Sequence, residues 1–300
     1  MTHRLATILL LSLVLTATAA AVQSTIRVDV RLVNVFATVT DANGRYVDGL
    51  NKQDFVVMED GKDREISHFS HDLDVPVSVG IILDASGSMQ NKIRTALNAV
   101  DRFIRTIHPD DDIFFMTFAS TVQLREDFTD DREKLSKALK GIPATGGTSL
   151  YDALRDGLTK IKSGRHQKRA ILLITDGEDN GSTASYPEVL QAIRESELLI
   201  YPLGISVGSY GQGRRDAVDM DVLKELADES GGRSFLLSDI LISNSGTQME
   251  RVLRLIADEL RSQYRLTFYS THPDDGRYHS LRIRARPGLV VRARPGYIAR

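Results

Sequence analysis

The sequence contains no cysteine, and this absence limits what can hold the protein together. Without cysteine the chain can form no disulfide and cannot carry a lipid on a lipobox cysteine. Its stability must therefore come from core packing and from any metal ion that it binds. A glycine-rich phosphate loop of the Walker type is also missing. The formal net charge is only -2, which gives no general electrostatic reason to expect nucleic acid or an anionic membrane as a partner.

Long apolar runs are missing too, except at the start of the chain. Met1–Arg4 form a short positive segment, Leu5–Thr16 are mostly apolar, and Ala17–Ala21 offer small residues for cleavage. This order is typical of a secretory signal peptide. We therefore expect residues 1–21 to be a signal peptide and the mature protein to be periplasmic or extracellular. An N-terminal membrane anchor that stays uncleaved is the alternative.

Between residues 75 and 263, apolar strands alternate with amphipathic helices. Residues 77–83 are apolar on nearly consecutive positions, as in a strand that is buried on both faces of a parallel sheet. The next apolar residues have the spacing of a helix that buries one face: Ile93, Leu97, Val100, Ile104 and Ile107. The alternation predicts a doubly wound α/β domain, with a mostly parallel sheet flanked by helices.

The two flanks of this domain, residues 22–74 and 264–300, have the alternating pattern of short β-strands. Ile26–Thr40 alternate between apolar and polar positions, and Tyr264–Tyr269 begin a similar pattern after the α/β segment. Each flank has too few strands to bury both faces of a core. We therefore expect both flanks to form one small β-sandwich into which the α/β domain is inserted.

The strongest chemical signal is the segment Asp84-Ala85-Ser86-Gly87-Ser88, which lies where the first buried strand ends. One carboxylate and two hydroxyls on alternate residues of a tight loop can converge on a hard cation. Two further loops, residues 145–149 and 175–179, are expected at the same carboxyl edge of the sheet, where ligands bind in doubly wound folds. A hydroxyl and a carboxylate from them would complete a shell of oxygen ligands, which suits Mg²⁺ and leaves room for an external oxygen.

The motifs Asp-x-Ser-x-Ser, Gly-Gly-Thr and Thr-Asp-Gly, in this order, resemble the metal-ion-dependent adhesion site of von Willebrand factor A domains. The resemblance covers residues 75–264. It implies one bound ion, Mg²⁺ or alternatively Mn²⁺ or Ca²⁺, with a ligand set drawn from all five positions of the motif: Asp84, Ser86, Ser88, Thr148 and Asp176. The flanks, including Val291–Tyr297, resemble the "VWFA-related" exported proteins of Acidobacteria.

Other interpretations of these motifs are open to test. Asp84-x-Ser-x-Ser alone is also typical of a helix N-cap. Gly204–Gly208 match the Gly-x-Ser-x-Gly elbow of α/β-hydrolases, but a loop-like composition follows instead of the required helix. Asp176–Glu188 partly match an EF-hand loop, although the last ligand position holds Pro187. Three of the seven histidines, His68, His71 and His108, are isolated and without metal-ligand spacing to a second histidine.

The sequence therefore predicts an exported binding module and not an enzyme. A partner protein would offer an Asp or Glu carboxylate to the metal, while nucleic acid and small-molecule substrates are not expected; we expect a monomer. In one alternative, the protein has a structural or assembly role and the metal only stabilises the fold. In another, it is a metal-assisted hydrolase, which would need a general base; none of the three loops contains a histidine.

Overall fold

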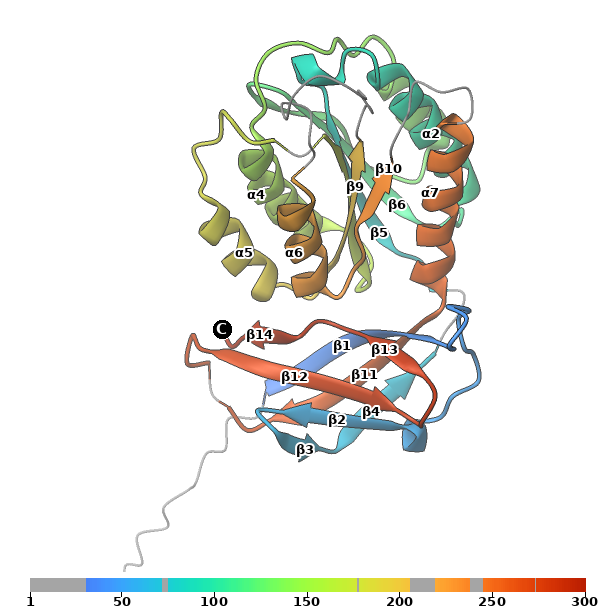
Figure 1. Cartoon of the computed structure of the whole chain (residues 1–300), viewed down its shortest axis with the longest axis vertical. Coiled ribbons are helices and arrows are strands. Elements are labelled where there is room, and N and C mark those ends of the chain that lie inside the picture. The colour runs from blue at the N-terminus through green and yellow to red at the C-terminus, as the bar shows by residue number, and fades with distance from the viewer. Residues whose placement is uncertain (1–30, 72–74, 177, 206–218, 238–244, 273) are drawn as a thin grey trace, which may run out of the picture.

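The computed structural model describes residues 31–71, 75–176, 178–205, 219–237, 245–272 and 274–300. An α/β unit lies on top of a smaller all-β unit (Figure 1). The expected signal peptide lies outside the described residues. None of the described helices is both long enough and apolar enough to cross a membrane.

The α/β unit is built on a six-stranded sheet in the order β10-β9-β8-β5-β6-β7. All neighbours are parallel except β6 and β7, which pair antiparallel at one edge. The central strands are buried along their whole length, which explains their consecutive apolar residues. The strands are β5 (Ser78–Asp84), β6 (Asp112–Phe118), β7 (Val122–Thr129), β8 (Arg169–Thr175), β9 (Leu199–Ile205) and β10 (Phe235–Leu237). This confirms the predicted fold class.

Helices cover both faces of this sheet (Figure 1). One face packs against α2 (Ile93–Thr106), α3 (Arg132–Ala138) and α7 (Ser245–Arg261). The other face packs against α4 (Leu150–Lys160), α5 (Tyr186–Arg194) and α6 (Met220–Ser230). Short 3-10 helices are η1 (Lys52–Asp54), η2 (Gly87–Met89) and η3 (Ile161–Ser163). The spacing of apolar residues predicted α2, whereas α3 buries only Leu135 and so shows no apolar period.

Two antiparallel four-stranded sheets form the all-β unit, in the orders β13-β1-β11-β4 and β14-β12-β2-β3. Each sheet combines strands from before and after the α/β unit, and the two share one apolar core. From the N-terminal flank come β1 (Arg31–Thr40), β2 (Phe55–Glu59), β3 (Lys62–Arg64) and β4 (Ile66–Ser70). From the C-terminal flank come β11 (Gln263–Ser270), β12 (Tyr278–Ala285), β13 (Val290–Arg292) and β14 (Gly296–Ile298). The domain limits at 74/75 and 263/264 stay a prediction.

A buried carboxylate connects the two units. Glu259 of α7 is 1% exposed. One carboxylate oxygen accepts a hydrogen bond from the Tyr201 hydroxyl of β9 at 2.8 Å. The other forms an ion pair with the Arg292 guanidinium of β13 at 2.5 Å. Arg292 also donates to the backbone carbonyl of Gly231, next to α6, at 2.9 Å. The sandwich is thus held to α7, to β9 and to the end of α6 by one charged network.

We expect Glu259→Gln to lower the free energy of unfolding by about 3 kcal/mol, because Arg292 loses the charge that compensates it in a largely buried position. Urea unfolding of the two proteins measures the difference. Glu250→Gln is the control on the same helix, since its ion pair with Arg102 lies at the surface and should be worth less than about 1 kcal/mol. Equal losses from both substitutions would contradict the importance of the buried network.

Candidate metal centre

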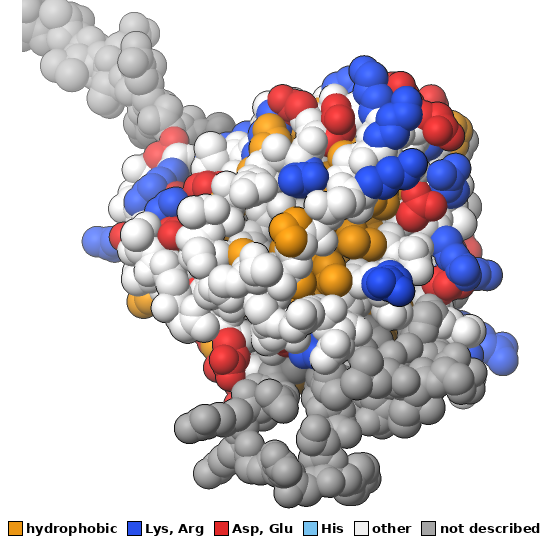
Figure 2. Space-filling model, turned by 90° about the horizontal axis from the view of Figure 1, so that it is seen from above, with side chains coloured by type: hydrophobic (Ala, Val, Ile, Leu, Met, Phe, Trp, Pro, Cys, Tyr) orange, Lys and Arg blue, Asp and Glu red, His pale blue; other side chains and the backbone are white. Residues whose placement is uncertain are grey.

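Three loops meet at the carboxyl edge of the six-stranded sheet. The loop after β5 contacts the end of β6, because the amide of Ala85 donates to the carbonyl of Phe118 at 2.7 Å. It also contacts the loop before α4: Thr145 N–H donates to Ala85 at 2.9 Å and Gly87 N–H donates to Gly146 at 3.0 Å. Figure 2 views this end of the molecule from above. The predicted juxtaposition of these loops is therefore present in the structure.

Asp84 is the most enclosed of the five predicted ligands, with no exposed surface. Its Oδ1 accepts a hydrogen bond from the amide of Ser86 at 2.8 Å, and its Oδ2 accepts one from the hydroxyl of Thr175 at 2.7 Å. Burial raises the pKa of Asp84 to about 6, against the lowering effect of these hydrogen bonds. The carboxylate is thus fixed in orientation at a position where a cation would compensate for its lost hydration.

The two serines of the motif lie side by side, with their hydroxyl oxygens 3.0 Å apart. Two neighbouring ligands of an octahedral Mg²⁺, each bonded at about 2.1 Å, are separated by about 3 Å. Ser86 precedes η2, but its side chain makes no capping hydrogen bond. The alternative interpretation of the motif as a helix cap is therefore not observed for this residue.

Thr148 is buried, and its loop is held by backbone contacts with the loop after β8. Its amide donates to Oδ1 of Asn180 at 2.8 Å, and its carbonyl accepts from the amides of Asn180 and Gly181 at 2.9 and 3.0 Å. Gly146 in the same loop has a φ of 85°, and a Cβ there would lie 2.7 Å from the hydroxyl of Ser120. Both the backbone conformation at position 146 and the space around it therefore favour glycine there.

Asp176 has one oxygen paired and one oxygen without a partner. Its Oδ2 forms an ion pair with the ammonium of Lys92 at 3.1 Å, and both side chains are more than nine-tenths buried. Its Oδ1 is buried and has no hydrogen-bond partner among the described residues. A buried polar atom of this kind needs an explanation, and a metal ion would supply one. Lys92 was not predicted from the sequence. Its position at the start of the helix that follows the motif is the one feature that places it near the site.

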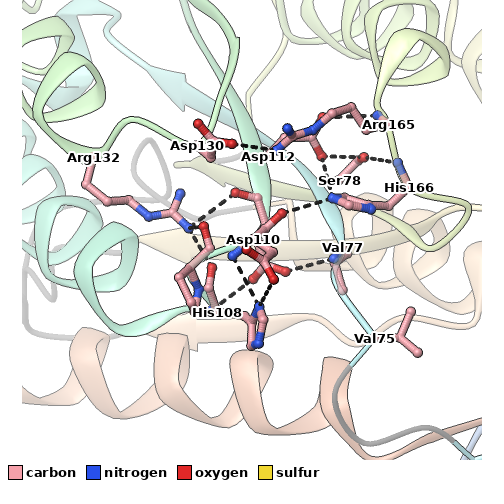
Figure 3. A network of polar contacts seen from close by, with 12 residues as sticks. Val75, Val77, Ser78, His108, Asp110, Asp112, Asp130, Arg132, Arg165 and His166 are labelled. Atoms are coloured by element: carbon pink, nitrogen blue, oxygen red, sulfur yellow. Dashed lines mark hydrogen bonds and ion pairs between the residues drawn. The ribbon is translucent and has the colours of Figure 1, made fainter.

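Buried aspartates at the opposite edge of the sheet are fully engaged by the protein (Figure 3). The Asp112 carboxylate accepts from the Ser78 hydroxyl at 2.6 Å and from the Arg165 amide at 3.0 Å. Asp111 accepts from the amide of Val77 at 2.7 Å and from the guanidinium of Arg261 at 2.5 Å. These two carboxylates are paired with other groups of the protein. Asp176 at the carboxyl edge differs, because one of its two oxygens has no hydrogen-bond partner among the described residues.

The remaining residues named from the sequence have less direct links to this edge. Asp179 accepts hydrogen bonds from the amides of Leu150 and Tyr151, so it caps α4. His68 and His108 belong to β4 and to the turn before β6. The Ser206 and Gly208 positions of the hydrolase-like motif lie outside the described residues.

Known structures share this fold. A von Willebrand factor type A structure from Catenulispora acidiphila superposes with a TM-score of 0.53 at 12% identity, over 90% of this chain and 74% of that one. Proximal thread matrix protein 1 of the mussel byssus, with a zinc-occupied MIDAS motif, superposes with a TM-score of 0.53 at 15% identity, over 68% of this chain and 50% of that one. At these identities the likeness is one of fold alone.

Curated relatives are similar over the α/β segment. An uncharacterised protein of Synechocystis sp. is 24% identical over 167 residues, and calcium-activated chloride channel regulator 1 of Equus caballus is 28% identical over 170 residues. Each alignment covers 54% of this chain but only 38% and 17% of those proteins. The chain thus spans less than half the length of either relative.

The model of the von Willebrand factor type A domain matches residues 79–178, from β5 to the loop after β8. This range includes all three loops of the carboxyl edge. The narrower resemblance to exported acidobacterial proteins stays a prediction. Residues 79–178 thus match the von Willebrand factor type A family, and the α/β unit has the fold of a type A domain.

Proposed function

We propose that this protein is an exported binding module that holds one divalent cation, Mg²⁺, and uses it to capture the carboxylate of a partner protein. The proposed ligands are the five residues of the motif: Asp84, Ser86, Ser88, Thr148 and Asp176. A divalent cation at this edge would supply Lewis acidity and an open coordination position. The residues around it would only orient the ion and its partner, so we propose no catalytic step.

The observation that carries this proposal is the Oδ1 of Asp176, which has no hydrogen-bond partner among the described residues and lies next to loops rich in hydroxyls. Asp176 and Asp84 lie close enough for each charge to affect the other, since the negative charge of Asp176 contributes to the raised pKa of Asp84. Two neighbouring buried carboxylates with one lysine leave the site with a net charge of -1. That environment favours a cation, and few charged ligands with several hydroxyls are what Mg²⁺ accepts.

Charge also supports an acidic partner. A divalent ion at a site of net charge -1 gives a local charge of +1, which an incoming carboxylate would neutralise. Figure 2 shows Lys and Arg side chains gathered on one side of this end of the molecule, with acidic side chains between them. Basic side chains at a rim speed the encounter with an acidic partner. The zinc-occupied MIDAS motif of the structurally similar mussel protein supports a metal ion at this edge.

One observation favours the structural alternative, in which no exchangeable ion is needed. The ammonium of Lys92 already neutralises one oxygen of Asp176, so the fold can bury this carboxylate without a metal. In that case the lysine would keep the site closed and metal addition would have no effect. The titration below separates the two functions.

We expect Mg²⁺ to bind the wild-type protein once, and Asp84→Ala to weaken binding at least about tenfold, equivalent to about 1.4 kcal/mol. The substitution removes a buried charge that offsets that of the ion. Calorimetric titration of Mg²⁺ measures this. Glu178→Gln is the control, because it removes an exposed charge from the same loop without touching a proposed ligand. The proposal fails if the wild type binds no divalent ion, or if Asp84→Ala binds Mg²⁺ as tightly.

We expect partner capture to depend on the same ion. Protein immobilised and incubated with an extract of the native cell envelope should retain its partner in Mg²⁺ and release it in EDTA. Thr148→Ala deletes one neutral oxygen, so it should weaken capture more than it weakens Mg²⁺ binding. The readout is the amount of retained protein by quantitative mass spectrometry, with Glu178→Gln as control. Retention that is equal with EDTA and with Mg²⁺ would exclude the role of the ion in capture.

A further inference from the structure

A second cluster of potential ligands lies in the β-sandwich, on the other unit from the type A motif. Asp60 is in the turn between β2 and β3, His272 follows β11, and His279 is in β12. One ligand atom from each lies within 4.8 Å of the others. We propose that these three residues form a binding site for a transition-metal ion of the Zn²⁺ class, independent of the Mg²⁺ site.

The distances in this cluster are close to those of a metal shell. Nδ1 of His279 is 2.8 Å and Nε2 of His272 is 3.3 Å from Oδ2 of Asp60. Ligands bonded to Zn²⁺ at about 2.0–2.1 Å in a tetrahedron are about 3.3 Å apart. Each histidine nitrogen therefore lies from the Asp60 oxygen at close to the distance that a shared ion requires.

The surrounding residues fix the orientation of the Asp60 carboxylate and the His279 ring. Oδ1 of Asp60 accepts hydrogen bonds from the amide and the hydroxyl of Ser280 at 2.8 and 3.1 Å, so Oδ2 is turned toward the histidines. Nε2 of His279 lies 3.3 Å from Oδ1 of Asp275. A carboxylate behind a ligating histidine sets which nitrogen faces the metal and orients the ring.

The exposure of the three side chains differs in a way that suits an exchangeable ion. His279 is only 5% exposed, while His272 and Asp60 are 29% and 35% exposed. The rings of the two histidines stack with centroids 4.1 Å apart. The buried residue would anchor the ion and the two at the surface would give it an entry path, with the open side left to water or an external ligand.

The donor set distinguishes this site from the carboxyl edge of the sheet. Two imidazole nitrogens and one carboxylate suit Zn²⁺, Co²⁺, Ni²⁺ or Cu²⁺ better than Mg²⁺. The nearby carboxylate of Glu59, 3.7 Å from His272, is engaged by the Arg64 guanidinium at 2.7 Å and the Tyr297 hydroxyl at 2.6 Å. Its charge is therefore already compensated, and we do not count it as a ligand.

Such an ion would join the two flanks of the sandwich. Asp60 belongs to the N-terminal flank and both histidines to the C-terminal flank, and Asp60 and His279 are 219 positions apart in the sequence. A metal bridge over this separation would stabilise the sandwich, since the ion binds a pre-formed site in the folded state only. It would supply a cross-link that a chain without cysteine cannot obtain from a disulfide.

The test is a Co²⁺ titration of tag-free protein that carries Asp84→Ala, so that the proposed Mg²⁺ site does not contribute. Visible absorption of Co²⁺ becomes strong when the ion leaves six-coordinate water for a four-coordinate protein site. We expect one bound ion, and His272→Ala should lower the Co²⁺ affinity by more than about tenfold. His68→Ala is the matched control, because it removes another exposed histidine of the same sandwich, and it should leave the affinity unchanged.

A second variant keeps all three ligands. Asp275→Asn removes the charge behind His279 and should lower the affinity by about tenfold. Absence of Co²⁺ absorption in the Asp84→Ala protein, or an affinity that His272→Ala leaves unchanged, would overturn the site. An affinity unchanged by Asp275→Asn would overturn the ligand role of His279. These results are distinguishable from the Mg²⁺ proposal, because the Asp84→Ala background weakens that site and His272 and Asp275 lie outside it.

Discussion

The carboxyl edge of the sheet depends on a carboxylate that has no contact with solvent. Asp84 is fully buried at the end of β5, where an amide and a hydroxyl hold its two oxygens. Because a buried charge is costly unless it is compensated, the loops around it are arranged to supply donors or a cation. The lysine at Asp176 and the adjacent serine hydroxyls are consequences of this constraint. The binding function that we propose follows from Oδ1 of Asp176, which has no hydrogen-bond partner among the described residues.

The insertion of the α/β unit gives the molecule two separate sets of polar ligands. Oxygen donors gather at the carboxyl edge, far along the chain from the imidazoles of the sandwich. Between them, the Glu259 network joins β13 of the sandwich to the α/β unit at the opposite end from the type A motif (Figure 1). In the part of the chain that the structure describes, no hydrogen bond or ion pair joins one set of ligands to the other, which allows each ion to be tested alone.

The sequence predicted the fold well where apolar residues recur at a regular spacing over a long segment. Buried strands such as β5 and amphipathic helices such as α2 follow directly from their apolar spacing. The short elements α3, β3 and β14 bury too few residues to leave a pattern. The five motif residues were identified because each lies in a short local signature. Lys92 and the Asp60–His279 pair could not be identified from the sequence. The pairing of side chains that are distant in the sequence depends on tertiary packing and not on local spacing.

The central claim is that a cation fills the carboxyl edge next to Asp176. The most direct measurement is anomalous X-ray scattering from crystals grown with Mn²⁺, which marks the position of the ion without reference to any activity. The account predicts a peak within bonding distance, about 2.2 Å, of the hydroxyl oxygens of Ser86 and Ser88. A map with no peak at this edge, and with the ammonium of Lys92 as the only cation at Asp176, would contradict it.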